Sequence, residues 1–170
     1  MAGLWIDQNG PVLANTVYNE GKLVAKDVAF TLPSVTPLTS DFRAMGTLTL
    51  PLLGQIEAME SSITKIGIDH GLSGLVKMEA KTLEFRFVQD VRTSDASSIQ
   101  RGCKAFLRVI PKNIPGLTVD PGNISENELT FAVTRYQLFI NGQEQWLIDQ
   151  LNQILRIAGK DYYNDIRSLL

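Results

Sequence analysis

The stretch LTFAVTRYQLFINGQEQWLID, residues 129–149, decides the fold of this chain. Its first half carries apolar residues at odd positions and its second half at even positions: Leu129, Phe131 and Val133, then Tyr136, Leu138 and Ile140. A period of two is typical of a strand that buries one face. One extra residue near Thr134 and Arg135, a β-bulge, would let both halves face the same core.

A turn signal follows this strand directly. Asn141-Gly142 joins two residues that tolerate a positive φ, which is a strong short-range sign of a β-hairpin. The return strand is therefore expected over Gln143 to Asp149.

Working outward, further segments also alternate. In residues 24–32 the even positions hold Val24, Lys26, Val28, Phe30 and Leu32, and Pro33 ends the strand. In residues 82–88 Leu83, Phe85 and Phe87 oppose Thr82, Glu84 and Arg86, and in residues 104–110 Ala105, Leu107 and Val109 oppose Lys104 and Arg108. The sequence therefore predicts a mainly β protein whose sheet is buried on one side.

Two short helices are expected beside the strands. Asp69 can cap the first helix, one face of which would carry Leu72, Leu75, Val76 and Glu79. Asp161 can cap the second, over residues 161–170, with Tyr162, Tyr163, Ile166, Leu169 and Leu170 on one side. A helix this short is marginal alone, so it must dock on its own sheet or on a neighbour.

Composition limits the possible functions. The chain has 170 residues, which fits a single domain, 1–170. Its net charge of −2 gives no basic footprint for gripping nucleic acid. Residues 1–9 hold no basic segment typical of a signal peptide, and no apolar stretch is long enough for a membrane-spanning helix, so no membrane anchoring is expected.

Residues for catalysis or metal binding are scarce. His70 is the only histidine and Cys103 the only cysteine, so a nucleophile pair needs these two to meet, and a zinc site lacks ligands. The acidic run from Asp120 to Glu128 lacks the spacing of an EF-hand and is interpreted as a solvated loop. Gly71-Leu72-Ser73-Gly74 is too short a motif to indicate a phosphate loop. We therefore expect no enzyme and no cofactor.

Apolar residues in unusual places favour assembly instead. Residues 45–56, MGTLTLPLLGQI, combine strong apolarity with Gly46, Pro51 and Gly54, which suits a projecting hairpin better than a core strand. An ordinary buried hairpin or edge strand is the alternative. The chain ends are also apolar, and this predicts subunit contacts at Leu4, Trp5, Ile6, Leu169 and Leu170.

The last third of the chain resembles the major tail tube protein of contractile-tailed phages and R-type pyocins. The resemblance rests on residues 135–144 (RYQLFINGQE), Ile148-Asp149, Asn152, Ile154, Arg156, Gly159-Lys160-Asp161 and Ile166-Arg167. Upstream, Thr31-Leu32-Pro33 and residues 56–60 (IEAME) also fit the pattern. Ala158-Gly159 departs from it, because the family usually has Asn-Gly there, and residues 1–16 form a longer N-terminal arm.

The resemblance implies a β-barrel-like sandwich, shared in general form by type VI secretion tube proteins. It implies hexameric rings that stack into a tube inside a contractile sheath, located in a virion tail assembled in the host cytoplasm. Expected partners are further copies of the chain, the sheath, a baseplate or initiator, a tape-measure protein and DNA that passes transiently through the lumen. A hairpin over residues 43–55 is implied to contact the adjacent ring through Arg43, Met45, Leu48, Leu50, Pro51, Leu52 and Leu53.

DNA slides most freely past a polar and preferably acidic wall, because like charges repel phosphate. The polar strand positions Glu57, Glu60, Thr82 and Glu84 are therefore expected to face the lumen. Arg86, Lys104 and Arg108 either face outward or pair with acids. Two other functions remain open: a monomeric β-barrel that binds a small ligand, and a subunit of a type VI secretion tube.

Overall fold

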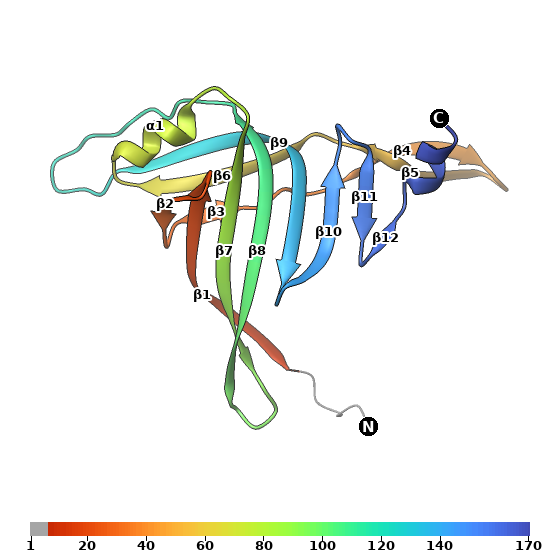
Figure 1. Cartoon of the computed structure of the whole chain (residues 1–170). Helices are drawn as coiled ribbons and strands as arrows, with labels where there is room; N and C mark the ends of the chain where they lie inside the picture. The colour runs from red at the N-terminus through yellow and green to blue at the C-terminus, as the bar shows by residue number, and fades with distance from the viewer. Residues whose placement is uncertain (1–6) are drawn as a thin grey trace.

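The computed structural model describes residues 7–170. Within them the chain is mainly β with short helices, as the sequence predicts (Figure 1). The elements are β1 (Gln8–Asn19), β2 (Lys22–Lys26), β3 (Ala29–Thr31), β4 (Pro37–Arg43), β5 (Thr47–Ile56), β6 (Met59–Ile66), α1 (His70–Val76), β7 (Lys81–Arg92), β8 (Ser98–Pro111), β9 (Glu126–Ile140), β10 (Gln143–Asp149), β11 (Ile154–Ile157), β12 (Lys160–Asp161) and α2 (Asn164–Ser168).

Ten strands form one curled antiparallel sheet. Its path runs β12-β11-β10-β9-β8-β7-β1-β2, and β6 branches from β9 and pairs in turn with β3. β4 and β5 form a separate two-stranded sheet. Within the described residues the sheet ends at β2 and β12 without closing, so the barrel-like expectation is met by an open, curled sheet and not by a closed barrel.

The predicted bulge lies in the middle of β9. Arg108 pairs with Arg135 and the next residue, Val109, pairs with Val133, so Thr134 is the extra residue. The buried positions change parity there, from Leu129, Phe131 and Val133 to Tyr136 and Leu138. The predicted bulge is therefore confirmed, and the strand that pairs with this edge of β9 changes at the same point. β9 pairs along one edge with β6 before the bulge and with β10 after it.

The hairpin after β9 also follows the prediction. Asn141 and Gly142 have φ values of 50° and 79°, the left-handed conformation that a tight two-residue turn needs. The return strand β10 covers Gln143–Asp149, the range expected from the sequence.

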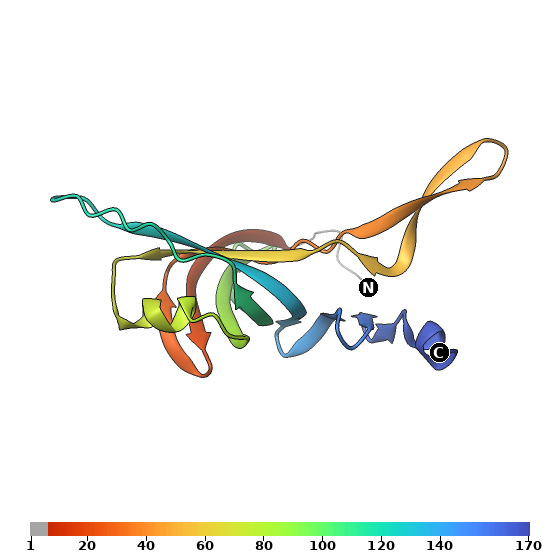
Figure 2. The same ribbon diagram turned by 90° about the horizontal axis from the view of Figure 1, so that it is seen from above.

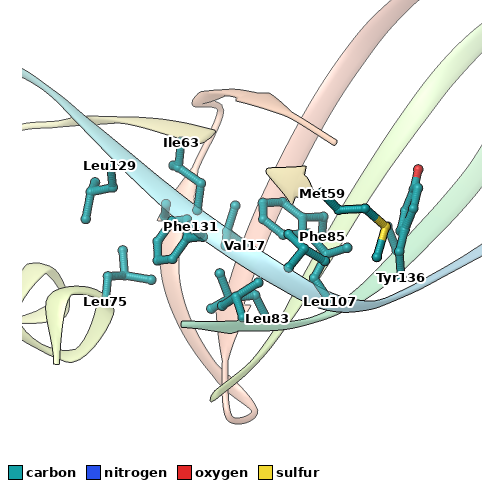
Figure 3. Packing of buried hydrophobic residues seen from close by; sticks show 14 of the residues in the cluster. Val17, Met59, Ile63, Leu75, Leu83, Phe85, Leu107, Leu129, Phe131 and Tyr136 are labelled. Atoms are coloured by element: carbon teal, nitrogen blue, oxygen red, sulfur yellow. The ribbon is translucent and has the colours of Figure 1, made fainter. Parts of the chain in front are cut away.

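Side chains from the curled sheet and α1 fill one hydrophobic core (Figure 3). Fully buried members come from β1, β6, β7, β8, β9 and α1: Val17, Ile63, Leu83, Phe85, Leu107, Leu129, Phe131 and Leu75. The Phe30 and Phe85 rings pack with their centroids 4.7 Å apart. Each such side chain contributes about 1.5–3 kcal/mol by leaving water, so the core holds the β6–β9 layer against the β1–β7–β8 layer.

The single strand expected over residues 24–32 is wrong. It is divided into β2 and β3 because Asp27 takes a φ of 51° and bends the chain. Asn15 secures the bend: its side-chain amide donates to the carbonyl of Val28 (2.7 Å), and its Oδ1 accepts the N–H of Val28 (3.0 Å). A side chain from the neighbouring strand β1 thus replaces hydrogen bonds that a continuous strand would make.

Asp69 caps α1 as predicted, accepting the N–H of Gly71 at 2.9 Å. The cap predicted at Asp161 is wrong, because α2 begins at Asn164 with Tyr163 in the cap position. The Asp161 carboxylate instead accepts the N–H of Tyr163, the residue just before the helix begins, at 3.0 Å.

A buried lysine closes the C-terminal end of α1. The Lys81 ammonium, on β7, donates to the carbonyls of Gly74 (2.7 Å), Leu75 (3.0 Å) and Lys77 (2.8 Å). Burial lowers the pKa of Lys81 below its usual value. These three carbonyls lie where a helix has no internal donors left, so the ammonium substitutes for them.

We predict that Lys81→Met lowers the free energy of unfolding by about 1–3 kcal/mol, because it leaves buried carbonyls without a donor. Urea denaturation followed by circular dichroism measures the loss. Lys77→Met is the matched control, since the Lys77 side chain is exposed and pairs only with Glu79 at the surface. Equal losses in the two variants would contradict the capping role.

Candidate assembly interface

The β4–β5 hairpin projects from the body of the molecule (Figure 2). Its strands pair with each other and with no other strand among the described residues. A two-stranded hairpin is marginally stable in water unless something packs against it. A stable hairpin therefore requires another surface to cover these strands.

One face of the hairpin is apolar. Phe42 pairs with Leu48 and Ser40 with Leu50, and directly opposed residues share a face. Phe42, Leu48 and Leu50 are 48%, 47% and 43% exposed, and Leu38 on the same side of β4 is also exposed. A contiguous patch of this kind on an extended arm is typical of a surface that binds another protein.

The other face is polar. Asp41 pairs with Thr49, whose hydroxyl donates to the Asp41 carboxylate at 2.7 Å, and Arg43 pairs with Thr47. At the tip, Met45 and Gly46 both have a positive φ, and the Met45 side chain is fully exposed. The hairpin therefore has one face suited to a partner and one suited to water.

The base of the hairpin contains a bulge. The register changes from Thr39 opposite Pro51 to Pro37 opposite Ile56, which leaves Leu52, Leu53 and Gly54 to bend β5. This bend lines an apolar cleft of about 480 Å³ between the hairpin and the β10–β11 strands. Its other walls come from Pro33, Val35, Tyr136, Trp146, Ile148, Leu155 and Ile157.

The C-terminal helix braces this base. Gly54 has a φ of 76°, and a β-carbon there would overlap the Tyr163 ring. Arg167 fixes the helix by donating to the Asp161 carboxylate (2.8 Å) and to the carbonyl of Gln153 (2.6 Å). The Arg167 hydrogen bond lowers the pKa of Asp161. Tyr163 is therefore held against the bend in β5.

The predicted hairpin residues thus occupy three positions. Arg43 and Met45 lie at the tip, with Arg43 on the polar face. Leu48 and Leu50 belong to the apolar face, and Pro51, Leu52 and Leu53 line the cleft at the base.

Three of the four residues expected to face a lumen share the outward face of the curled sheet. Thr82 and Glu84 lie on β7 opposite Arg108 and Phe106, and Glu60 on β6 pairs with Ala132 of β9. Ala132 pairs in turn with Ile110 of β8, which makes the surface continuous. Glu57 lies in the link between β5 and β6, where its N–H donates to the carbonyl of Thr36 at 2.8 Å.

Basic residues pair with acids on this face. Arg86 pairs with Glu84 at 2.5 Å, Arg108 with Glu20 at 3.7 Å, and Lys112 with Glu60. Lys104 has no ion pair among residues 7–170. Arg86 and Arg108 lie on the same face as Thr82 and Glu84 and pair with acids, which is one of the two arrangements expected for them. The face is therefore not acidic, because its three paired acids, Glu20, Glu60 and Glu84, accompany four bases, Arg86, Lys104, Arg108 and Lys112.

The outward face also contains a groove of about 710 Å³ that the sequence analysis does not predict. The Phe106 and Phe139 rings meet edge to face at 5.8 Å, and the Arg86 guanidinium lies 4.5 Å from the centre of the Tyr18 ring. The missed signal is the aromatic pair itself, since Phe106 and Phe139 occupy positions where alternation expects polar residues.

Comparison with known proteins gives this geometry a context. The sequence profile of the phage tail tube protein FII family matches residues 12–170, which is most of the chain. The chain belongs to the phage tail tube protein FII family. A search of curated proteins found no match.

Two solved structures share the tail tube fold. The first comes from the sheath-tube complex of an extracellular contractile injection system, PVC, in its extended state. It matches this chain with a TM-score of 0.56 and 15% sequence identity, and the match covers 76% of this chain and 90% of the other. The second comes from the sheath/tube terminator of the same system. It matches this chain with a TM-score of 0.54 and 14% sequence identity, and the match covers 82% of this chain and 99% of the other.

The apolar chain ends of this tail tube protein are only partly described. Leu4, Trp5 and Ile6 lie outside the described residues. Leu169 and Leu170 follow α2 and are 87% and 89% exposed. Residues 8–16, part of the expected N-terminal arm, belong to β1 and pair with β7.

Residues with catalytic potential are dispersed. His70 is exposed at the start of α1, whereas Cys103 is buried in β8 between Phe87 and Ile140. Burial raises the pKa of the Cys103 thiol, which disfavours the nucleophilic thiolate. In residues 7–170 no three His, Cys, Asp or Glu side chains gather as metal ligands, and no helix could span a membrane.

The brace at Gly54 predicts a specific difference between two glycines. Gly54→Ala forces the Tyr163 ring away and strains a positive φ, whereas Gly46→Ala meets nothing within 4 Å and suffers only the strain at its φ of 126°. A positive φ costs a non-glycine residue about 1–3 kcal/mol. Gly54→Ala adds the overlap with Tyr163 to this strain, so it should lower the free energy of unfolding further.

Hydrogen exchange separates the two effects. Amides of α2 should exchange faster in Gly54→Ala and remain unchanged in Gly46→Ala. If both variants leave the exchange of α2 unchanged, Tyr163 does not brace the hairpin.

Proposed function

We propose that this chain is a structural, non-catalytic subunit that forms hexameric rings, which stack into the tail tube inside a contractile sheath. The observation that carries the proposal is the free β4–β5 hairpin, whose apolar face has no cover among the described residues. Membership of the tail tube family supports the same conclusion. The role is mechanical, because the tube conveys DNA or punctures an envelope without bond-making chemistry.

The hairpin supplies the contact between rings. Phe42, Leu48 and Leu50 are about half exposed, so covering each on a neighbouring copy gains about half of the ~1.5–3 kcal/mol that complete burial of such a side chain is worth. The same contact stabilises a hairpin that is marginal alone. Tip residues Arg43 and Met45 reach farthest from the body and complete the surface.

Strand edges supply the contact within a ring. The sheet path ends at β2 and β12, whose outer backbone groups have no strand partner in residues 7–170. Open edges recruit further strands, and closing them between copies removes the risk of uncontrolled pairing. Six copies joined edge to edge then wall a common lumen.

The lumen and the particle account for the remaining partners. The outward face, with Thr82, Glu84 and Glu60, suits a wall past which DNA moves, because the acids that pair with Arg86 and Lys112 leave these bases little net attraction for phosphate. Glu57 borders this wall. The sheath surrounds the tube, a baseplate or initiator starts it, a tape-measure protein occupies it, and the assembled protein resides in the virion tail.

Electron microscopy of the purified chain tests the proposal. Concentrated protein, alone and with an initiator complex, should form rings or tubes of uniform bore in negative stain. A chain that stays monomeric in light scattering under both conditions, and that retains a small molecule, would instead be a binding module.

Substitution on the apolar face of the hairpin sharpens the test. Leu48→Asp places a charge in the proposed apolar contact and should reduce tube formation at least tenfold, because an unpaired buried charge is costly. Met78→Asp is the matched control: Met78 is a 57% exposed apolar residue in the turn after α1, outside the hairpin, and the variant should assemble normally. Turbidity and particle counts measure assembly, and circular dichroism verifies folding. Normal tubes from Leu48→Asp would show that the apolar face is not buried between rings.

A further inference from the structure

A second projecting arm lies at the end of the molecule opposite the hairpin. Residues 112–125 connect β8 to β9 without a helix or strand of their own, and they extend away from the body in both views (Figures 1 and 2). We call them the 112–125 loop. Connections this long are uncommon in compact domains unless they bind something.

The loop displays apolar side chains to solvent. Ile114, Leu117, Val119 and Ile124 are 69%, 45%, 81% and 76% exposed. Single exposed apolar residues are ordinary, but four within one short segment form a patch. Asp120 is the only charged residue from 113 to 125.

Both ends of the loop are fixed to the sheet. The Asn113 Oδ1 accepts the N–H of Thr130 at 2.8 Å, and its amide donates to the carbonyl of Glu128 at 3.2 Å. At the other end, the N–H of Gly67 donates to the carbonyl of Ser125 at 2.8 Å, and the buried Asn127 amide donates to Gly67 at 3.0 Å. Fixed ends reduce the ordering cost of binding.

The hairpin and the loop complement each other in charge and polarity. Both display exposed apolar side chains, and both carry charges that have no ion pair among the described residues. The loop has Asp120. The hairpin has Asp41, whose carboxylate accepts the Thr49 hydroxyl, and Arg43, which lies nearer the tip. They lie at opposite ends, so one copy cannot join its own pair. Contact between two copies is then heterologous, and a heterologous contact repeats along an axis.

We propose that the 112–125 loop is the seat for the β4–β5 hairpin of a second copy of this chain, with Arg43 of one copy facing Asp120 of the next. The apolar residues of the loop cover Phe42, Leu48 and Leu50. This inference rests on the proposed function, because it names the surface that receives the hairpin.

A charge exchange tests the pairing. Arg43→Asp and Asp120→Arg should each slow tube formation about tenfold, because like charges then meet in the contact. The double variant Arg43→Asp with Asp120→Arg should recover assembly to within about threefold of the parent protein, since the pair is restored in reverse. Arg43→Asp with Glu79→Arg is the mismatched control, which introduces an exposed arginine outside the loop and should not recover.

Cysteine crosslinking tests proximity directly. Cys103, the only native cysteine, is buried, so Leu48→Cys with Val119→Cys adds the only exposed thiols of the described residues. Mild oxidation of assembled tubes should give a ladder of covalent multimers on a non-reducing gel, while each single variant stays monomeric.

The outcomes separate this inference from the proposed function. If the parent chain forms tubes but the double charge variant does not recover assembly and the two cysteines give no ladder, the hairpin seat is overturned. The proposed tube function then still holds. Tubes in which Val119→Cys alone forms dimers also overturn the hairpin seat, because the loop then meets its own counterpart. A parent chain that never assembles overturns both.

Discussion

The fold depends on one extra residue in the longest strand. Thr134 shifts the register of β9 so that its two halves bury opposite parities while both face the same core. The same residue marks where one edge of β9 passes from β6 to β10. Without the bulge, either Leu129 and Phe131 or Tyr136 and Leu138 would face solvent, because a one-residue slip reverses every side chain that follows. Both layers of the sheet are thus tied to a single continuous strand.

Much of this architecture is readable from local sequence. The change of parity at Thr134, the Asn141-Gly142 turn and the Asp69 cap are all signals carried within a few residues. The break at Asp27 is not, because it depends on Asn15, a side chain from another strand, satisfying the backbone there. Local sequence also does not show whether the sheet closes into a barrel, because closure depends on how far the curled strands extend around the core and not on any short pattern.

Local sequence likewise predicts some features of the proposed assembly surface and not others. Residues 45–56 reveal the hairpin because strong apolarity with Pro51 and Gly54 conflicts with a core strand. The contact between Gly54 and Tyr163 could not be read, because it joins two residues whose own segments give no sign of each other. The sequence predicts a solvated loop from Asp120 to Glu128, whereas β9 already begins at Glu126. Val119 and Ile124, beside and within that run, are apolar and 81% and 76% exposed. Composition identified a loop there but not its apolar display.

Where the apolar surface sits explains how such a chain can fold before it assembles. The core residues are enclosed by the curled sheet and α1, so folding requires no second copy. Exposed apolar residues gather on the hairpin and on the 112–125 loop, which lie at opposite ends of the molecule (Figures 1 and 2). Others, such as Leu169 and Leu170, lie outside these two segments. A single hairpin-to-loop contact is small and pays the full entropy of association, whereas a copy entering a formed ring meets several neighbours at once. In the proposed assembly, growth on an existing ring is therefore favoured over pairing of free subunits.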